Sequence, residues 1–308
     1  MPVAQPNADK SLAILELFND EQPWLRVGDV SRLMSVSDST ASRLLARLEA
    51  RGFVERYPET GFYALGPRIL TLAGVAMNHS DVRRAALEEM YRLVHALGLG
   101  ANLAVLRESG VFYLGNLDGR HAPRYYTLLG RRYPLHATAL GKILLAWREP
   151  AEISALVSVP AGARPGSTPP SMAPSAPTTE LTGTALQRYS PSTIGDVGAL
   201  LRQLELVRSR GYATEVEELA HGRACVAAPI RGRNGSVIAG LSVSGPVGIM
   251  NLEEREGDLA EAAVDAAMRI SERLGFVMAP LDAMTSGEAM PAWHAAQAPR
   301  SGGGSSSR

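Results

Sequence analysis

Apolar positions recur at helical spacing in three short segments at the start of the chain, in the ranges 10–19, 27–34 and 39–50. In the third segment Leu44, Leu45 and Leu48 fall on one face, and Gly52 follows where a helix commonly ends. Pro23 separates the first segment from the second. The spacing therefore predicts three consecutive short helices.

After the third helix the period changes to that of strands. Phe53–Tyr57 and Phe62–Leu65 are short apolar and aromatic runs on either side of Pro58–Gly61, whose glycine suits the positive φ of a hairpin turn. Three helices followed by a β-hairpin are the order of elements in a winged helix-turn-helix.

A helical pattern returns from Pro67 to Leu97 and is interrupted near residues 78–81. We interpret the range 66–79 as a connecting helix between two domains. Ser80 or Asp81 can cap the helix that follows, and Gly98 can end it.

The remainder of the chain mixes both periods. Strands are predicted at 101–107, 111–114, 124–129, 212–217, 224–231 and 236–244, and helices at 137–148, 196–210 and 251–274. Helices before, between and after a group of strands predict an α+β fold, here a sensor-like domain around one mostly antiparallel sheet.

Two segments are predicted to be disordered. Val159–Thr179 contains six prolines among alanine, serine and glycine, and the tail Ala283–Arg308 ends in a run of glycine and serine. Neither composition offers enough apolar surface to offset the entropy of ordering.

Composition restricts the classes of protein to consider. The chain has 308 residues, of which 45% are hydrophobic and 20% charged, which is typical of globular domains. It has no apolar run of the roughly 18 residues that a membrane span requires and no signal-peptide pattern at its start. The single cysteine, Cys225, excludes internal disulfides and cysteine-cluster metal sites, so a cytoplasmic location is expected.

Charge offers no general affinity for nucleic acid. Lysine plus arginine and aspartate plus glutamate number 31 each, and residues 1–75 carry eight basic against nine acidic side chains. Affinity for phosphates must therefore come from arginines that are clustered locally.

Such a cluster lies in the third predicted helix, where Arg43, Arg47 and Arg51 repeat every four residues on one face. Hydroxyl side chains occupy the start of this helix, namely Ser37, Ser39, Thr40 and Ser42. Hydroxyls and arginine can contact base edges in the major groove, whereas Arg47 and Arg51 suit phosphates or ion pairs. The alternative is that Ser37 or Asp38 only caps the helix and that the other side chains are solvated.

The combined pattern resembles the IclR family of bacterial transcriptional regulators, from about Lys10 to Phe276. The stretches that carry the resemblance are Asp38–Leu45, Pro58–Gly61, Leu65–Arg68, Leu135–Lys142, Arg210–Tyr212, Cys225–Ile230 and Leu241–Pro246. The resemblance implies a winged-helix DNA reader joined by a helix to a GAF/PAS-like effector-binding domain, acting as a homodimer or homotetramer.

Three positions depart from the family's habit. Asp38 stands where a basic residue is common, Ser42 where an aromatic one is common, and Phe62 where arginine is usual. The proline-rich insertion is also unusual for the family. The expected domains are a winged helix-turn-helix at 1–66, a linker helix at 67–80, an effector-binding domain at 81–282 and the tail at 283–308.

Two strand segments bring candidate polar chemistry to the second domain. Ser242 and Ser244 alternate with apolar residues, so both hydroxyls project to one face, where a ligand, a water or a backbone carbonyl could be the partner. Cys225 lies in an apolar strand and is either a buried small side chain or, with His221 as base, a nucleophile.

The segment His136–Lys142 is not a phosphate loop, because it lacks the required glycine and has Ile143 where serine or threonine is needed. The free N–H groups at the start of its helix still favour an anion. The resemblance implies effector contacts by a set of six residues, Ala139, Leu140, Glu215, Cys225, Ser242 and Ser244.

The leading hypothesis is a transcriptional repressor or activator that binds a palindromic operator and senses a small organic acid, with aromatic acids among the candidates. The alternatives are a small-molecule enzyme that uses Cys225, with the N-terminal helices serving oligomerisation, and a ligand-blind architectural protein. No motif predicts a cofactor, a metal site or contact with a membrane.

Overall fold

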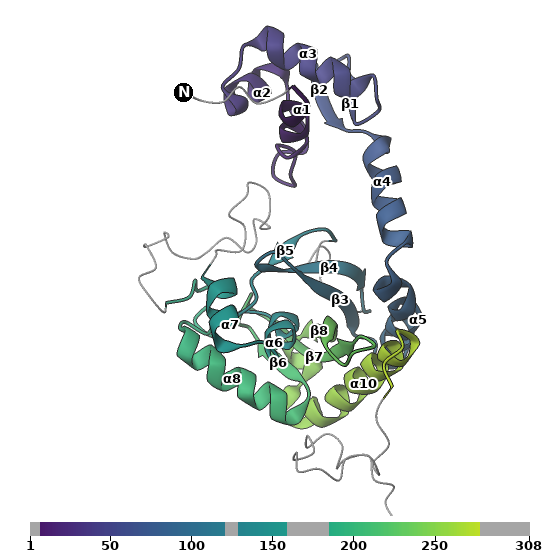
Figure 1. Cartoon of the computed structure of the whole chain (residues 1–308), viewed down its shortest axis with the longest axis vertical. Coiled ribbons are helices and arrows are strands. Elements are labelled where there is room, and N and C mark those ends of the chain that lie inside the picture. Colours follow the sequence, from purple (N-terminus) through teal and green to yellow (C-terminus); the bar gives the residue numbers. More distant parts are fainter. Residues whose placement is uncertain (1–6, 121–128, 159–184, 278–308) are drawn as a thin grey trace, which may run out of the picture.

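The computed structural model describes residues 7–120, 129–158 and 185–277 and consists of two folded parts joined by a helix (Figure 1). The first part contains α1 (Asn7–Leu15), α2 (Val27–Met34), α3 (Asp38–Glu49), β1 (Val54–Tyr57) and β2 (Phe62–Leu65). The two strands pair antiparallel, and the apolar faces of all three helices meet in one small core. This is the predicted winged helix-turn-helix.

Local signals end the elements of this part. Gly52 has φ 72°, its N–H donates to the Glu49 carbonyl at 2.8 Å, and the Phe53 N–H donates to the Leu48 carbonyl at 2.9 Å. These two bonds form a Schellman motif, as Gly52 predicted. Helix α1 ends four residues before the predicted Asn19, because the Asn19 side chain accepts the backbone N–H groups of residues 21 and 22 and turns the chain.

The connection between the two parts is α4 (Pro67–Asn78), followed by α5 (Asp81–Leu97). The Ser80 hydroxyl accepts the Arg83 N–H at 3.3 Å, so Ser80 rather than Asp81 is the cap of α5. Gly98, at φ 68°, ends α5. A helix over most of the range 66–79 and a break after it thus agree with the pattern in the sequence.

The second part is built on one six-stranded sheet in the order β5-β4-β3-β8-β7-β6, in which every pair of neighbours is antiparallel. The strands are β3 (Gly100–Arg107), β4 (Gly110–Leu117), β5 (Arg132–Tyr133), β6 (Ala213–Val216), β7 (Arg223–Arg231) and β8 (Val237–Pro246). The α+β class and the antiparallel sheet agree with the sequence prediction.

Helices cover both faces of this sheet (Figure 1). One face packs against α5 and α10 (Leu252–Arg273), and the other against α6 (Ala139–Leu145), α7 (Pro150–Val157) and α8 (Val197–Arg210). A single turn of helix, α9 (Val247–Met250), follows β8. The sheet therefore separates two apolar layers, and the candidate effector residues lie in the layer under α6.

Some expectations for the second part need correction. Leu129, the end of a predicted strand at 124–129, lies in a turn, and the strand that pairs with β4 is β5 instead; the other residues of that prediction lie outside the described ranges. The sequence pattern also missed α7 and α9; α9 has only four residues, which is too few to show a helical period.

The segments 159–179 and 283–308, predicted to be disordered, also lie outside the described residues. Among the helices of the described ranges, none has both the length and the apolar character needed to cross a lipid bilayer.

Candidate functional site

Helix α3 has one buried and one exposed face. Ala41, Leu44, Leu45 and Leu48 are buried against the rest of the winged helix. The opposite side exposes most of the predicted DNA contacts, namely Ser39, Ser42, Arg43 and Arg47, and Thr40 is half-buried. Figure 1 shows α3 on the side of the winged helix turned away from the six-stranded sheet. This placement suits a helix that enters the major groove.

Ser37 is the cap of α3. Its hydroxyl accepts the Thr40 N–H at 3.3 Å and lies 3.1 Å and 3.0 Å from the hydroxyls of Ser39 and Thr40. The capping alternative is thus correct for Ser37 and wrong for Asp38, which is the first helical residue. The contacts of the hydroxyls and arginines with DNA stay a prediction.

Two further arginines, which the sequence reading passed over, lie at the wing. Phe62 stands where the resemblance led us to expect arginine. The Arg26 guanidinium lies 4.3 Å from the centre of the Phe62 ring. Arg56 on β1 is exposed and lies 6.0 Å from the Tyr63 ring. Both bring positive charge to the wing by cation–π contact. No periodic signal in the sequence predicts this pairing of α2 with the hairpin.

The four strand residues of the candidate effector site share one face of the sheet. Glu215 pairs with Cys225, Cys225 pairs with Ser244, and Ser242 lies two residues from Ser244 on the same strand. Cys225 belongs to the apolar layer that contains α6, whereas its neighbour Val226 belongs to the opposite layer. Cys225 thus lies between Glu215 and Ser244, each of which is its direct partner on a neighbouring strand.

Helix α6 covers this face. The Thr138 hydroxyl accepts the Gly141 N–H at 3.0 Å, and the Thr138 carbonyl accepts the Lys142 N–H. Among the described residues the N–H groups of Ala139 and Leu140 have no hydrogen-bond partner. The Leu140 side chain packs on Gly240 of β8 so closely that a Cβ there would lie 2.8 Å from it. Glycine at 240 therefore allows α6 to approach the sheet.

The partner of the two serine hydroxyls is a side-chain amide. Asn102 on β3 donates to the Ser244 hydroxyl at 3.0 Å and to the Ser242 hydroxyl at 3.4 Å. Its carbonyl oxygen accepts the Asn116 amide of β4 at 2.8 Å. Asn102 escaped the sequence reading because it lies 140 residues from Ser242 and joins it only through the pairing of β3 with β8.

Cys225 has the surroundings of a buried side chain rather than a nucleophile. Burial raises the pKa of its thiol to about 12, although the charge of Arg223 acts in the opposite direction. The His221 side chain is 73% exposed and lies 4.0 Å from Glu217. At neutral pH the thiol is therefore protonated, and no feature of these surroundings activates it.

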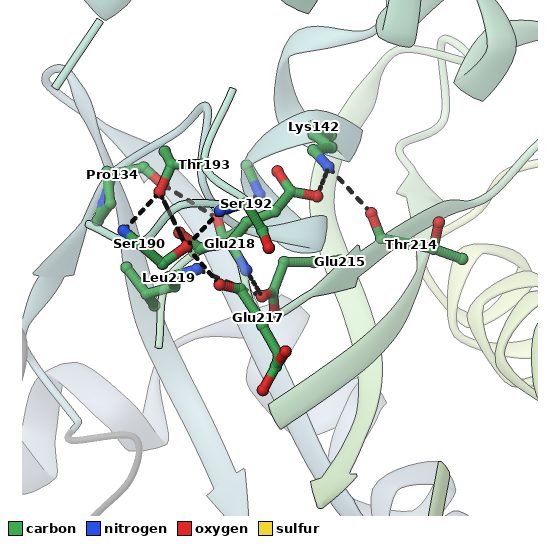
Figure 2. Close-up of polar contacts among 12 residues, drawn as sticks. Pro134, Lys142, Ser190, Ser192, Thr193, Thr214, Glu215, Glu217, Glu218 and Leu219 are labelled. Atoms are coloured by element: carbon green, nitrogen blue, oxygen red, sulfur yellow. Dashed lines mark hydrogen bonds and ion pairs between the residues drawn. The ribbon is translucent and has the colours of Figure 1, made fainter. Parts of the chain in front are cut away.

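The backbone of the following loop fixes the Glu215 carboxylate. One of its oxygens accepts the N–H groups of Glu218 at 2.7 Å and Leu219 at 3.3 Å (Figure 2). Glu215 is nearly fully buried at the edge of the site. The loop therefore holds this negative charge in one position.

Lys142, part of the segment that superficially resembles a phosphate loop, has a structural role here. Its ammonium is buried and donates to the Glu218 carboxylate at 2.5 Å and to the Thr214 carbonyl at 3.0 Å. Burial raises the pKa of Glu218, an effect that Lys142 opposes. In the same loop, the Ser190 hydroxyl donates to the Glu217 carbonyl and the Thr193 hydroxyl donates to the Glu218 carbonyl (Figure 2).

Two more buried polar side chains share this face and were absent from the predicted site. Tyr113 on β4 packs edge-on against Tyr133 with ring centres 4.9 Å apart, and burial raises the pKa of its phenol. Arg223 is the first residue of β7, two positions before Cys225. Within the described ranges no group of His, Cys, Asp or Glu side chains is arranged to hold a metal ion.

Comparison with known proteins identifies both parts. Residues 7–58 match the IclR helix-turn-helix domain, and residues 74–164 and 172–272 match the C-terminal domain of bacterial IclR transcriptional regulators. The Escherichia coli regulator XynR is 31% identical over 279 residues, which cover 90% of this chain and 99% of XynR. The regulator KdgR of Dickeya chrysanthemi is 31% identical over 87% of this chain and 79% of KdgR.

Solved structures agree with the fold. An IclR homologue from Microbacterium hydrocarbonoxydans, complexed with 4-hydroxybenzoate, is 26% identical, has a TM-score of 0.70, and is matched over 87% of this chain and 99% of its own. A regulator from Rhodococcus sp. RHA1 shares the fold with a TM-score of 0.72. Both halves of the chain, in the same order and over nearly the full length of XynR, thus correspond to one kind of protein. The chain belongs to the IclR family of transcriptional regulators, and its helix-turn-helix is a DNA-binding domain.

Proposed function

We propose that this regulator binds a palindromic operator as a homodimer or homotetramer, and that a small organic acid bound beneath α6 controls its affinity for that operator. The observation that supports this proposal is that Glu215, Cys225 and Ser244, which come from three adjacent strands, share the face of the sheet that packs against α6. Polar groups gathered in an otherwise apolar layer are typical of a small-molecule site.

The acid's carboxylate would accept the N–H groups of Ala139 and Leu140, and the hydroxyls of Ser242 and Ser244 would orient the ligand. Because Asn102 already donates to both hydroxyls, each serine keeps its own hydrogen to donate to a ligand. The homologue complexed with 4-hydroxybenzoate makes aromatic acids the first compounds to test.

For DNA we propose base and phosphate contacts by the predicted set, Ser37, Ser39, Thr40, Ser42, Arg43 and Arg47. The domain boundaries that we propose are 1–66, 67–80 and 81–282, with 283–308 outside both folded parts. A regulator that must reach chromosomal DNA in a bacterium acts in the cytoplasm, which is the location we propose.

Titration calorimetry of the purified chain with benzoate, 4-hydroxybenzoate, propionate and succinate tests the effector site. An acid that binds the wild type should bind Ser242→Ala, Ser244→Ala and Cys225→Val less tightly, by about 3- to 10-fold for each lost hydrogen bond. The same acid should change operator affinity, because regulation requires different affinities for the two states.

Ser209→Ala is the matched control, since Ser209 is an exposed serine of α8 whose hydroxyl bonds only to its own helix. If one of these acids binds all three site variants as tightly as the wild type, the effector site lies elsewhere in the protein.

A further inference from the structure

Arg26 stands immediately before α2, at a position where helices usually carry a short capping side chain such as serine, threonine or aspartate. An arginine side chain has no acceptor atom to offer to the N–H groups of a helix start. Asp29 stabilises this start instead, because its carboxylate accepts the Arg26 backbone N–H at 2.9 Å. Arg26 is also exposed, so neither capping nor burial accounts for its long charged side chain.

The backbone next to Arg26 is fixed against the hairpin. Leu25 and Tyr63 exchange two backbone hydrogen bonds, at 3.0 Å and 2.8 Å. Because neighbouring residues of a strand project to opposite faces, the buried Tyr63 places Phe62 on the outer face of β2. The Arg26 guanidinium lies over the Phe62 ring, 4.3 Å from its centre. The ring therefore holds a positive charge on the outside of the junction between α2 and the hairpin.

The contact with Phe62 orients the guanidinium of Arg26 without neutralising it. A cation–π contact engages the face of a guanidinium, whereas its N–H donors lie in the plane of the group and point outward. Within the described ranges the Arg26 side chain forms no ion pair, and the nearby Asp29 carboxylate pairs with Arg32 at 3.4 Å. The donors of Arg26 are thus directed at whatever anion meets this surface.

The anion that meets a DNA-binding domain is a backbone phosphate. In a helix-turn-helix the second helix enters the major groove and the first helix crosses the sugar–phosphate backbone. Here α3 is the second helix and α2 the first, so the start of α2 belongs to the surface that faces phosphates. Residues 1–75 carry eight basic against nine acidic side chains, so phosphate contacts must come from individually placed arginines.

We propose that Arg26 binds a phosphate of the DNA backbone beside the groove that α3 enters, and that Phe62 positions its guanidinium for this contact. This inference rests on DNA binding by the helix-turn-helix and adds a residue outside α3 to the contact surface. The competing explanation is that the stacked pair only fastens α2 to the hairpin. That role would leave the salt dependence of DNA binding unchanged.

Fluorescence anisotropy at a series of salt concentrations, starting from about 50 mM, tests the contact. Two duplexes of equal length are compared, one from the gene's own upstream region and one of unrelated sequence. Arg26→Gln should lower the slope of log affinity against log salt by about one for each bound copy of the chain. It should also bind both duplexes at least about 10-fold more weakly, since a phosphate contact does not depend on base sequence. Arg26→Lys keeps the charge and should keep the slope.

A double-mutant cycle tests the role of Phe62. Phe62→Leu removes the ring but keeps an apolar side chain, so it should weaken DNA binding about threefold when Arg26 is present. In the Arg26→Gln background the same change should have no effect. Arg107→Gln is the matched control, because it removes an exposed arginine of β3 in the other folded part, and it should keep both affinity and slope. Thermal unfolding checks that each variant folds.

An Arg26→Gln variant with the salt slope of the wild type overturns the phosphate contact and leaves the stacked pair a structural role alone. Weaker binding to the upstream duplex only, with the unrelated duplex unaffected, also overturns it and indicates a base contact. Equal effects of Phe62→Leu with and without Arg26 overturn the positioning role of Phe62. If the wild type binds neither duplex at about 50 mM salt, DNA binding by this surface fails and the role of Arg26 fails with it.

Discussion

The Cys225 thiol is 4% exposed and lies in the sheet between Glu215 and Ser244. Burial raises its pKa from about 9 to about 12, because an ionised sulfur loses its hydration in the apolar layer. Since the native pKa is higher than the unfolded one, the free energy of unfolding should fall as the pH rises through the window from 9 to 12. Below that window the thiol is protonated in both the native and the unfolded state, so it makes no pH-dependent contribution to the free energy of unfolding.

At the residue scale we predict a protected thiol. A disulfide reagent such as DTNB at pH 8 should react with the native protein at least about 100-fold more slowly than with the urea-unfolded chain, because only the exposed thiolate attacks. Cys225 is the single cysteine of the chain, so the signal comes from one site. Rapid labelling of the native protein would mean that the cysteine is accessible and ionised.

At the element scale, α3 combines a buried leucine face with an exposed face that carries its arginines. We predict that Arg43→Ala weakens binding to DNA from the gene's own upstream region by about 10- to 100-fold and relaxes base preference, since one good base contact is worth about 1–3 kcal/mol. Fluorescence anisotropy measures both effects.

The control for this prediction is Arg107→Ala, which removes an exposed arginine at the end of β3 in the other part of the molecule. It should leave operator affinity unchanged. If Arg43→Ala and the wild type bind the operator with equal affinity and equal base preference, Arg43 does not contact the bases.

At the scale of the whole molecule, α4 is an apolar helix without cover. The described part of the chain buries none of the side chains of α4. Leu70 is 75% exposed and Val75 is 54% exposed. A helix with apolar side chains on several faces is normally buried, so a second copy of the chain is the natural cover. A palindromic operator requires the same two-fold arrangement.

We therefore predict that Leu70→Glu combined with Val75→Glu converts the protein to a monomer in sedimentation at micromolar concentration and weakens operator binding. Leu206→Glu is the matched control, because Leu206 is a similarly exposed leucine of α8. A double variant that remains dimeric would place the dimer contact outside α4.

The two folded parts also meet away from α4. Arg131, next to β5, forms an ion pair with Asp20 of the winged helix, beside an open cavity of about 790 Å³ between the two parts. So sparse a contact allows the two parts to move relative to each other. Such movement is what an effector needs in order to change operator affinity.

The sequence alone determined most of the elements and the identity of the DNA-binding part. Its signals were local: the leucine spacing of α3, the positive φ of Gly52 and Gly61, and the cap at Ser80 each act within a few residues. It did not predict the short helices α7 and α9 or the two-residue strand β5, since such elements are stabilised by their neighbours rather than by their own pattern.

Only the tertiary structure decided what surrounds the candidate effector residues. The pairing of β3 with β8 brings Asn102 to the serines, and the pairing of β6 with β7 sets Glu215 beside Cys225. Register also places the buried Arg223 on the same face as Cys225, although Arg223 looks like any other arginine in the sequence. Strand register places residues more than a hundred positions apart within hydrogen-bond distance, and burial then sets their charge and hydrogen bonding, which no local pattern encodes.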